Sequence, residues 1–118
     1  MSSKVGRLVV DLDGTLCEQT AGGDAYALAK PHQVVIDKVN QLYDSGWHVT
    51  IHTARGMATF GMKELAEDKY WDVTGRWLND NGVKYHELVF GKPAGDYYID
   101  DKGLGIAEFV SGNFVRRK

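Results

Sequence analysis

The segment from residue 7 to residue 53 places two apolar runs on either side of an amphipathic helix pattern. The first run is rich in branched aliphatic residues and is stopped by Gly14, which is typical of a strand buried on both faces. Between Pro31 and Gly46, apolar residues recur at spacings of three and four, as on one face of a helix. The second run predicts a strand at residues 47–53. Short joints between these elements favour a right-handed crossover between parallel strands, and therefore an α/β fold.

The rest of the sequence predicts more elements of the same kinds. Residues 17–30 are small and polar, with Gly22 and Gly23 side by side, and predict a loop or a short hairpin. The elements expected after residue 56 are a helix in two pieces within residues 57–82, its second piece from about residue 70 to residue 80, strands at residues 84–90 and 96–100, and a short strand or helix at residues 109–115. We expect a three-layer, Rossmann-like α/β domain with a mostly parallel central sheet.

Length and composition bound the number of domains and the class of protein. A chain of 118 residues supplies one ordinary domain and no linker divides it, so residues 1–118 are predicted to form a single domain. Hydrophobic residues make up 43% and charged residues 25%, which is a globular composition. The net charge of -2 gives no basic surface to neutralise nucleic-acid phosphates, so a nucleic-acid partner is not expected.

Cysteine usage and hydropathy indicate the compartment. Cys17 is the single cysteine, which excludes an internal disulfide and a cysteine-built zinc site, and we interpret it as a small buried apolar residue. The N-terminus has no apolar run long enough for a signal peptide, and nowhere do about 20 apolar residues follow one another. We therefore expect a soluble, cytoplasmic protein with no membrane partner.

Polar residues follow each predicted strand at the point where it ends. Because the carboxyl ends of parallel strands share one edge of a sheet, these residues should converge on one site. They are Asp11 and Asp13 after the first strand, Thr53 after the second, Lys92 after the third, and Asp100 with Asp101 after the fourth.

These residue types together suit phosphoryl transfer. Three carboxylates, Asp11, Asp13 and Asp100, demand a cation, and hard oxygen ligands favour Mg²⁺ shared with a phosphate. Thr53 offers a hydroxyl donor, and Lys92 offers a positive charge for phosphoryl oxygens. An aspartate can act as the nucleophile and form an aspartyl phosphate, while a second carboxyl group turned back by a tight turn acts as general acid and base.

The run Asp11-Leu12-Asp13-Gly14-Thr15-Leu16 resembles the first signature of the haloacid dehalogenase (HAD) superfamily of phosphohydrolases. Thr53 resembles the second signature, Gly91-Lys92-Pro93 the third, and Asp100-Asp101 the fourth. All four occur in the family's order and span residues 8–102.

The resemblance implies a role for each of these residues. Asp11 would be nucleophile and magnesium ligand, and Asp13 the acid and base, touching the metal through its backbone carbonyl. Thr53 and Lys92 would hold the phosphoryl group, and Asp100 would complete the metal shell. Asp101 would ligate the metal, orient Lys92 or contact the metal ligands without binding the metal itself. An aspartate at position 13 favours a phosphatase, because the family's dehalogenases lack that acid.

Arg55, close after Thr53, has two interpretations. Its guanidinium suits bidentate binding of a substrate phosphate or carboxylate, and a salt bridge at the rim of the site is equally compatible with its position. The turn from Thr53 to Gly56 and the ending from Tyr98 to Lys102 are similar to small phosphatases associated with capsular polysaccharide biosynthesis. That similarity implies a phosphorylated sugar or a related metabolite as substrate.

Spacing also bears on access to the site. Many HAD relatives carry a cap domain after the first signature or between the second and third, and residues 16–31 and 57–90 leave no room for one. The expected site is open unless the loop around Gly22 and Gly23 or a neighbouring subunit of a homo-oligomer covers it. The function predicted is that of a magnesium-dependent phosphomonoesterase. Two alternatives are a non-catalytic module that binds a phospho-ligand or partner, and a phosphotransferase to a hydroxyl acceptor.

Overall fold

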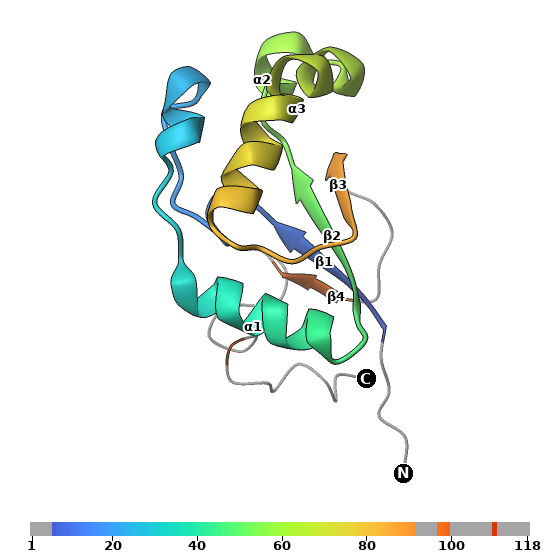
Figure 1. The fold of residues 1–118 in the computed structure, drawn as a ribbon. Coiled ribbons are helices and arrows are strands. Elements are labelled where there is room, and N and C mark those ends of the chain that lie inside the picture. The colour runs from blue at the N-terminus through green and yellow to red at the C-terminus, as the bar shows by residue number, and fades with distance from the viewer. Residues whose placement is uncertain (1–5, 92–96, 100–109, 111–118) are drawn as a thin grey trace.

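A computed structural model describes residues 6–91, 97–99 and 110 of the 118-residue chain (Figure 1). Strands and helices alternate along it, which confirms the α/β class. The elements in chain order are β1 (Arg7–Asp11), the 3-10 helix η1 (Gly23–Leu28), α1 (Gln33–Asp44), β2 (His48–Thr53), α2 (Met57–Phe60), α3 (Lys63–Asp80), β3 (Glu87–Phe90) and β4 (Tyr97–Ile99).

The four strands form one parallel sheet in the order β3-β2-β1-β4. In the register of this sheet, Val10 of β1 lies between Ile51 of β2 and Ile99 of β4, and Thr53 of β2 is paired with Phe90 of β3. The carboxyl ends of all four strands therefore reach the same edge, which is the edge that the sequence predicted for the site.

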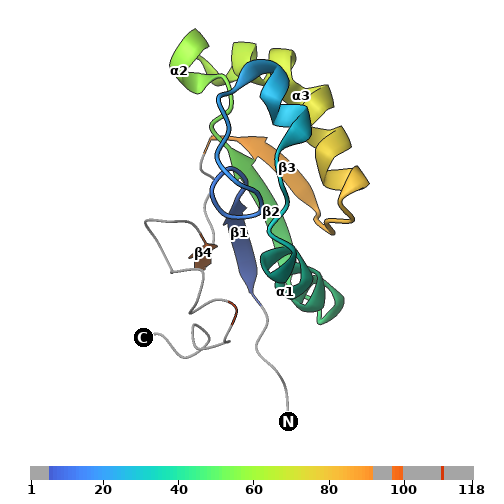
Figure 2. The same ribbon diagram turned by 90° about the vertical axis from the view of Figure 1, so that its left-hand side faces the viewer.

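Both long helices cover the same face of the sheet (Figure 2). The connections from β1 to β2 and from β2 to β3 advance across the sheet in the same direction, and right-handed crossovers then place α1 and α3 on one side. The described helices thus supply one layer against the sheet. The third layer of the sequence-based prediction, and all but Val110 of the segment 109–115, lie outside the described residues.

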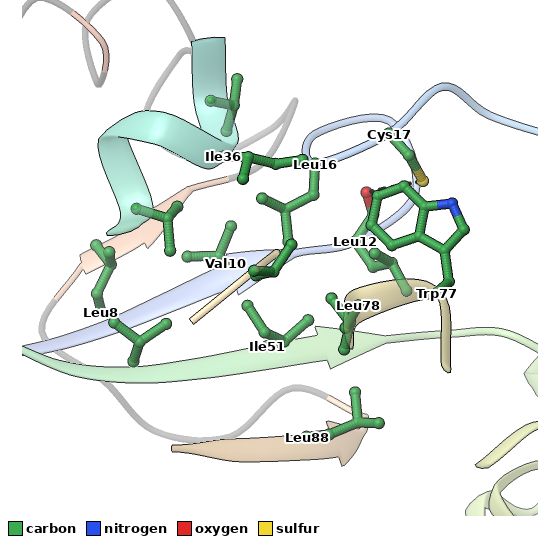
Figure 3. Packing of buried hydrophobic residues seen from close by; sticks show 14 of the residues in the cluster. Leu8, Val10, Leu12, Leu16, Cys17, Ile36, Ile51, Trp77, Leu78 and Leu88 are labelled. Carbon is green, nitrogen blue, oxygen red and sulfur yellow. Dashed lines mark hydrogen bonds between the residues drawn. The ribbon is translucent and has the colours of Figure 1, made fainter. Parts of the chain in front are cut away.

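A single apolar cluster joins the helices to the sheet (Figure 3). Leu8 and Val10 of β1 and Ile51 of β2 face Ile36 of α1 and Leu78 of α3, and all five are fully buried. Burying a side chain of this size contributes about 1.5–3 kcal/mol relative to leaving it exposed. The cluster fixes α1 and α3 against the sheet and leaves the carboxyl edge to polar residues.

The loop after β1 and the start of α3 differ from the sequence-based expectations. The loop contains η1 where a short hairpin was one alternative, and a bridge between Cys17 and Pro31 closes its base. The helix expected from about residue 70 begins at Lys63, because Gly61, at φ 71, ends α2 and Met62 is extended. The first turns of α3 bury little apart from Ala66, so apolar periodicity gave no signal there. Among the described helices, none is both long and apolar enough to cross a bilayer.

Candidate active site

Asp11 ends β1 at the carboxyl edge of the sheet. It is paired in register with His52 of β2, and its Oδ1 lies 3.8 Å from His52 Nε2. The Asp11 side chain is 20% exposed and that of His52 is 12% exposed. The Asp11 carboxylate can therefore be reached from solvent, whereas the His52 ring is mostly buried. A partly desolvated carboxylate at a strand end is suited to meet a cation or an electrophile.

The residues after β1 form the tight turn that the sequence predicted. The amides of Leu16 and Cys17 donate to the Leu12 carbonyl at 2.9 and 3.2 Å, and the Gly14 amide donates to the Cys17 carbonyl at 2.7 Å. Gly14 has φ +90, a conformation that L side chains rarely adopt. The turn reverses the chain directly after Asp13 and fixes where its carboxylate leaves the backbone.

The Asp13 carboxylate is bound by the Arg55 guanidinium. Arg55 Nε donates to Oδ2 at 3.0 Å and lies 3.3 Å from Oδ1, and Arg55 Nη2 donates to Oδ1 at 3.0 Å. The Arg55 side chain is 0% exposed and that of Asp13 is 16% exposed. A buried guanidinium needs such a partner, because an isolated buried charge is costly.

Two further contacts hold the Arg55 side chain. Its Nη1 donates to the hydroxyl of Thr74 on α3 at 3.2 Å, and its Cζ lies 4.1 Å from the centre of the Tyr26 ring on η1. The Tyr26 ring in turn packs edge-on against Tyr70 of α3, at 5.0 Å between ring centres. Arg55 therefore joins the turn after β1, the loop after it and α3.

Cys17 also faces Asp13. Its thiol lies 3.6 Å from the Leu12 carbonyl and 3.5 Å from Asp13 Oδ1. Burial first, and then the negative charge of Asp13, raise the pKa of the Cys17 thiol to about 12. The same two causes, in the same order, raise the pKa of the Tyr26 phenol. Cys17 is therefore a neutral thiol at physiological pH and no nucleophile, which agrees with its interpretation as a buried residue.

Thr53 is the last residue of β2 and lies beside the Asp13–Arg55 pair. It is fully buried, and its Oγ1 accepts a hydrogen bond of 3.1 Å from the Arg55 amide. The Gly91 amide, at the end of β3, donates to the Thr53 carbonyl at 3.1 Å. The Thr53 hydroxyl keeps its own hydrogen, which remains available as a donor.

The structure thus brings Asp11, Asp13, Thr53 and Arg55 to one edge of the sheet. The other predicted site residues, Lys92, Asp100 and Asp101, lie outside the described residues. Sequence reasoning missed Tyr26 and Thr74, which surround Arg55. No sequence signal marked them, because Tyr26 lies in a polar loop and Thr74 lies on a helix far along the chain.

The oxygen donors at this edge fit a magnesium ion. The Asp11 carboxylate and the Asp13 carbonyl are hard ligands, and Gln19 Nε2 donates to that carbonyl at 3.2 Å, which leaves its second lone pair. Within residues 6–91, 97–99 and 110, no group of three or more His, Cys, Asp or Glu residues could by itself hold a metal. The described residues therefore present two hard oxygen donors, the Asp11 carboxylate and the Asp13 carbonyl, and no complete metal site.

Comparison with known proteins finds relatives among solved structures. No protein-family model matches the sequence, and no curated protein matches it. The crystal structure of an MCSG target from Vibrio cholerae is 34% identical in sequence, with a TM-score of 0.72, and the match covers 89% of this chain and 87% of that one.

Two more distant structures share the fold. The D,D-heptose 1,7-bisphosphate phosphatase from B. bronchiseptica, complexed with magnesium and phosphate, is 15% identical with a TM-score of 0.50, over 72% of this chain and 49% of that one. A chain of the Pnkp1/Rnl/Hen1 complex is 18% identical with a TM-score of 0.55, over 98% of this chain and 37% of that one. At these identities the likeness establishes the fold.

Proposed function

We propose that this chain, which belongs to the same family as the Vibrio cholerae protein, is a single-domain, capless phosphatase of the HAD superfamily. Its reaction would be magnesium-dependent hydrolysis of a phosphomonoester. The observation that carries the proposal is the partly exposed Asp11 carboxylate at the carboxyl edge of the sheet, followed by a turn that directs Asp13 back to the same edge. The shared fold with a phosphatase that binds magnesium and phosphate supports it.

In the first step, a carboxylate oxygen of Asp11 attacks the phosphorus atom of the substrate. The bond between phosphorus and the leaving oxygen breaks, and that oxygen takes a proton from Asp13 as it departs. Asp13, a carboxylate paired with Arg55 in the free protein, takes up this proton from solvent when the anionic substrate binds. The products of this step are the free alcohol, an acyl phosphate on Asp11 and an ionised Asp13. Asp11 and Asp13 are two residues apart in the sequence, and the tight turn at Gly14 directly after them supports this division of roles.

In the second step, water attacks the phosphorus atom of the acyl phosphate. Asp13, now ionised, accepts a proton from that water, and the bond between phosphorus and the Asp11 oxygen breaks. Inorganic phosphate leaves, Asp11 is again a carboxylate and Asp13 again carries its proton. One carboxyl group therefore serves as acid and then as base.

Magnesium would be held by the Asp11 carboxylate, the Asp13 carbonyl and Asp100, with Asp101 as a ligand or as a support for the ligands. The ion would neutralise the charge of Asp11 and of the phosphoryl oxygens. The register between Val10 and Ile99 supports the participation of Asp100, because Asp11 and Asp100 are the next residues in sequence after this pair.

Thr53 and Lys92 would hold the phosphoryl group. The Thr53 hydroxyl lies at the strand end beside the Asp13 and Arg55 pair, and Lys92 follows β3 two residues after Phe90, the partner of Thr53. Phosphate binding by Arg55 stays a prediction, and the contacts of its guanidinium favour another role.

The substrate would be a phosphorylated small molecule, such as a sugar phosphate or a related metabolite, in the cytoplasm. No cap would cover the site, because the first interval between signatures is occupied by η1 and the second by α2, α3 and β3. Water exclusion would then come from the substrate, from the η1 segment or from a second subunit of a homo-oligomer.

Hydrolysis of p-nitrophenyl phosphate tests this function. Purified protein is assayed with Mg²⁺ and with excess EDTA, next to the variants Asp11→Asn and Asp37→Asn. Asp37 is an exposed acidic residue on α1, far along the chain from the site, and is the matched control. We expect turnover by the wild type and by Asp37→Asn, and loss of at least about a hundredfold with EDTA or with Asp11→Asn.

Other results would point to the alternatives. Undiminished activity of Asp11→Asn would overturn the nucleophile. Metal-dependent phosphate binding without turnover of a broad panel of phosphate esters would identify a binding module. Transfer of the phosphoryl group to added acceptor alcohols, at the expense of inorganic phosphate, would identify a phosphotransferase.

A further inference from the structure

We infer that Arg55 is a positioning residue that acts through Asp13, and that the Tyr26 ring on η1 holds Arg55 in this position. The inference rests on the proposed function, in which Asp13 donates a proton to the leaving group. It gives Arg55 a role other than direct phosphate binding, and it makes the loop after β1 part of the catalytic machinery.

All three nitrogen atoms of the Arg55 guanidinium have hydrogen-bond partners within the protein. Nε and Nη2 are bound to Asp13, Nη1 is bound to Thr74, and no part of the side chain is exposed. A side chain that binds a substrate phosphate from an open site must present donors to that site. Arg55 presents its donors to Asp13, so its influence on the substrate passes through that carboxyl group.

The two carboxylate oxygens of Asp13 differ in the number of donor atoms near them. Oδ1 lies near three donor atoms, Arg55 Nε at 3.3 Å, Arg55 Nη2 at 3.0 Å and Cys17 Sγ at 3.5 Å. Among the described residues, a single donor atom lies near Oδ2, Arg55 Nε at 3.0 Å. Since a carboxylate oxygen offers two lone pairs, Oδ2 is the oxygen with room for the proton that moves to the leaving group. The fork of Arg55 fixes which way Oδ2 faces.

The Arg55 guanidinium is itself held in place by an aromatic ring. The centre of the Tyr26 ring lies 4.1 Å from Arg55 Cζ, and the Tyr26 and Tyr70 rings pack perpendicular to each other at 5.0 Å between their centres. A cation over an aromatic ring is attracted by the negative face of the ring, and the attraction is stronger where water is excluded. The Arg55 amide is bound by Thr53, so backbone and side chain of this residue are both restrained.

Positioning of a general acid has a kinetic signature that phosphate binding lacks. A basic leaving group needs its proton during bond cleavage, whereas a weakly basic one departs without much help. Phenyl phosphate and p-nitrophenyl phosphate have nearly the same shape, but the leaving group of phenyl phosphate is the more basic. Loss of Arg55 should therefore slow the hydrolysis of phenyl phosphate more than that of p-nitrophenyl phosphate. The parameter to compare is kcat/KM, which covers the steps up to formation of the phosphoenzyme.

The experiment measures kcat/KM for both esters with the wild type and the variants Arg55→Lys, Thr74→Val, Tyr26→Leu and Tyr26→Phe. Thermal unfolding of each variant reports whether it is folded, and Thr74→Val is nearly isosteric in case Arg55→Lys fails to fold. The matched control is Tyr43→Leu, since Tyr43 of α1 stacks on His86 and, among the described residues, contacts none of Asp13, Arg55, Tyr26 and Thr74. In Arg55→Lys, we expect kcat/KM for phenyl phosphate to fall about tenfold more than kcat/KM for p-nitrophenyl phosphate.

Thr74→Val and Tyr26→Leu should show the same preferential loss of kcat/KM for phenyl phosphate, but a smaller one. Tyr26→Phe keeps the aromatic ring, so its kcat/KM values should lie closer to those of the wild type. Tyr43→Leu should keep the wild-type ratio between the two esters. Equal losses for both esters would overturn the inference in favour of a structural role. A raised KM for both esters at unchanged kcat would overturn it in favour of phosphate binding. A wild type that hydrolyses neither ester would overturn the proposed function, and the positioning role with it.

Discussion

The indole Nε1 of Trp77 donates a hydrogen bond of 2.8 Å to the backbone carbonyl of Ala29. Both residues are buried, and the bond ties α3 to the end of the loop that follows β1. The same two segments carry Thr74 and Tyr26, the neighbours of Arg55. This hydrogen bond in the core therefore helps to fix the position of Tyr26 on η1 relative to Thr74 on α3, and with it the surroundings of Arg55.

Trp77→Phe should reduce the free energy of unfolding by about 1–3 kcal/mol, because it removes this bond, leaves a buried carbonyl unpaired and shrinks a buried ring. Trp71→Phe is the control, since the Trp71 side chain is 44% exposed, and its cost should stay within about 0.5 kcal/mol. Urea unfolding followed by circular dichroism measures both. Equal costs would show that the Trp77 bond contributes nothing.

Gly56→Ala should destabilise the protein more than Gly61→Ala. Both glycines have positive φ, 80 and 71, so both substitutions strain the backbone by about 1–3 kcal/mol. A Cβ at Gly56 would also meet the Tyr70 ring at 2.7 Å, while nothing lies within 4 Å of one at Gly61. Melting temperatures of the two variants measure the difference. A Gly61→Ala variant as unstable as Gly56→Ala would contradict the close packing of Tyr70.

Stability at alkaline pH should depend on Cys17. The folded protein raises the pKa of its thiol from 9.0 to about 12, so folding favours the protonated form. This contribution is complete below pH 9.0 and is lost as pH rises towards about 12. The difference in free energy of unfolding between wild type and Cys17→Ala should therefore shrink across that range. A constant difference would contradict the raised pKa, as would rapid alkylation of the folded protein by iodoacetamide below pH 9.0.

The sequence predicted the elements that carry strong periodicity. β1, α1 and β2 combine apolar runs with short joints, and their order predicted the parallel pairing that the structure contains. The start of α3 could not be found in this way, because its first turns bury little apart from Ala66 and so leave no apolar stripe to detect.

The site was predictable where it depends on strand ends and less so where it depends on side-chain partners. Asp11 and Thr53 are the last residues of β1 and β2 and Asp13 follows β1, so the strand order alone brought them together. The partner of Arg55 was not predictable, because Asp13 and Arg55 are separated by 42 residues and meet through rotamers that a pattern does not encode. The sequence left two interpretations of Arg55, and the salt bridge is present, buried instead of at the rim.

Trapping of the phosphoenzyme tests the central claim most directly. The protein is mixed with p-nitrophenyl phosphate and Mg²⁺, quenched, treated with borohydride and digested, and the peptide that contains residue 11 is analysed by mass spectrometry. Borohydride reduces an aspartyl phosphate to homoserine, so the account predicts homoserine at position 11, dependent on substrate and absent in Asp11→Asn. Turnover without homoserine at position 11, or with homoserine at another aspartate, would contradict the account.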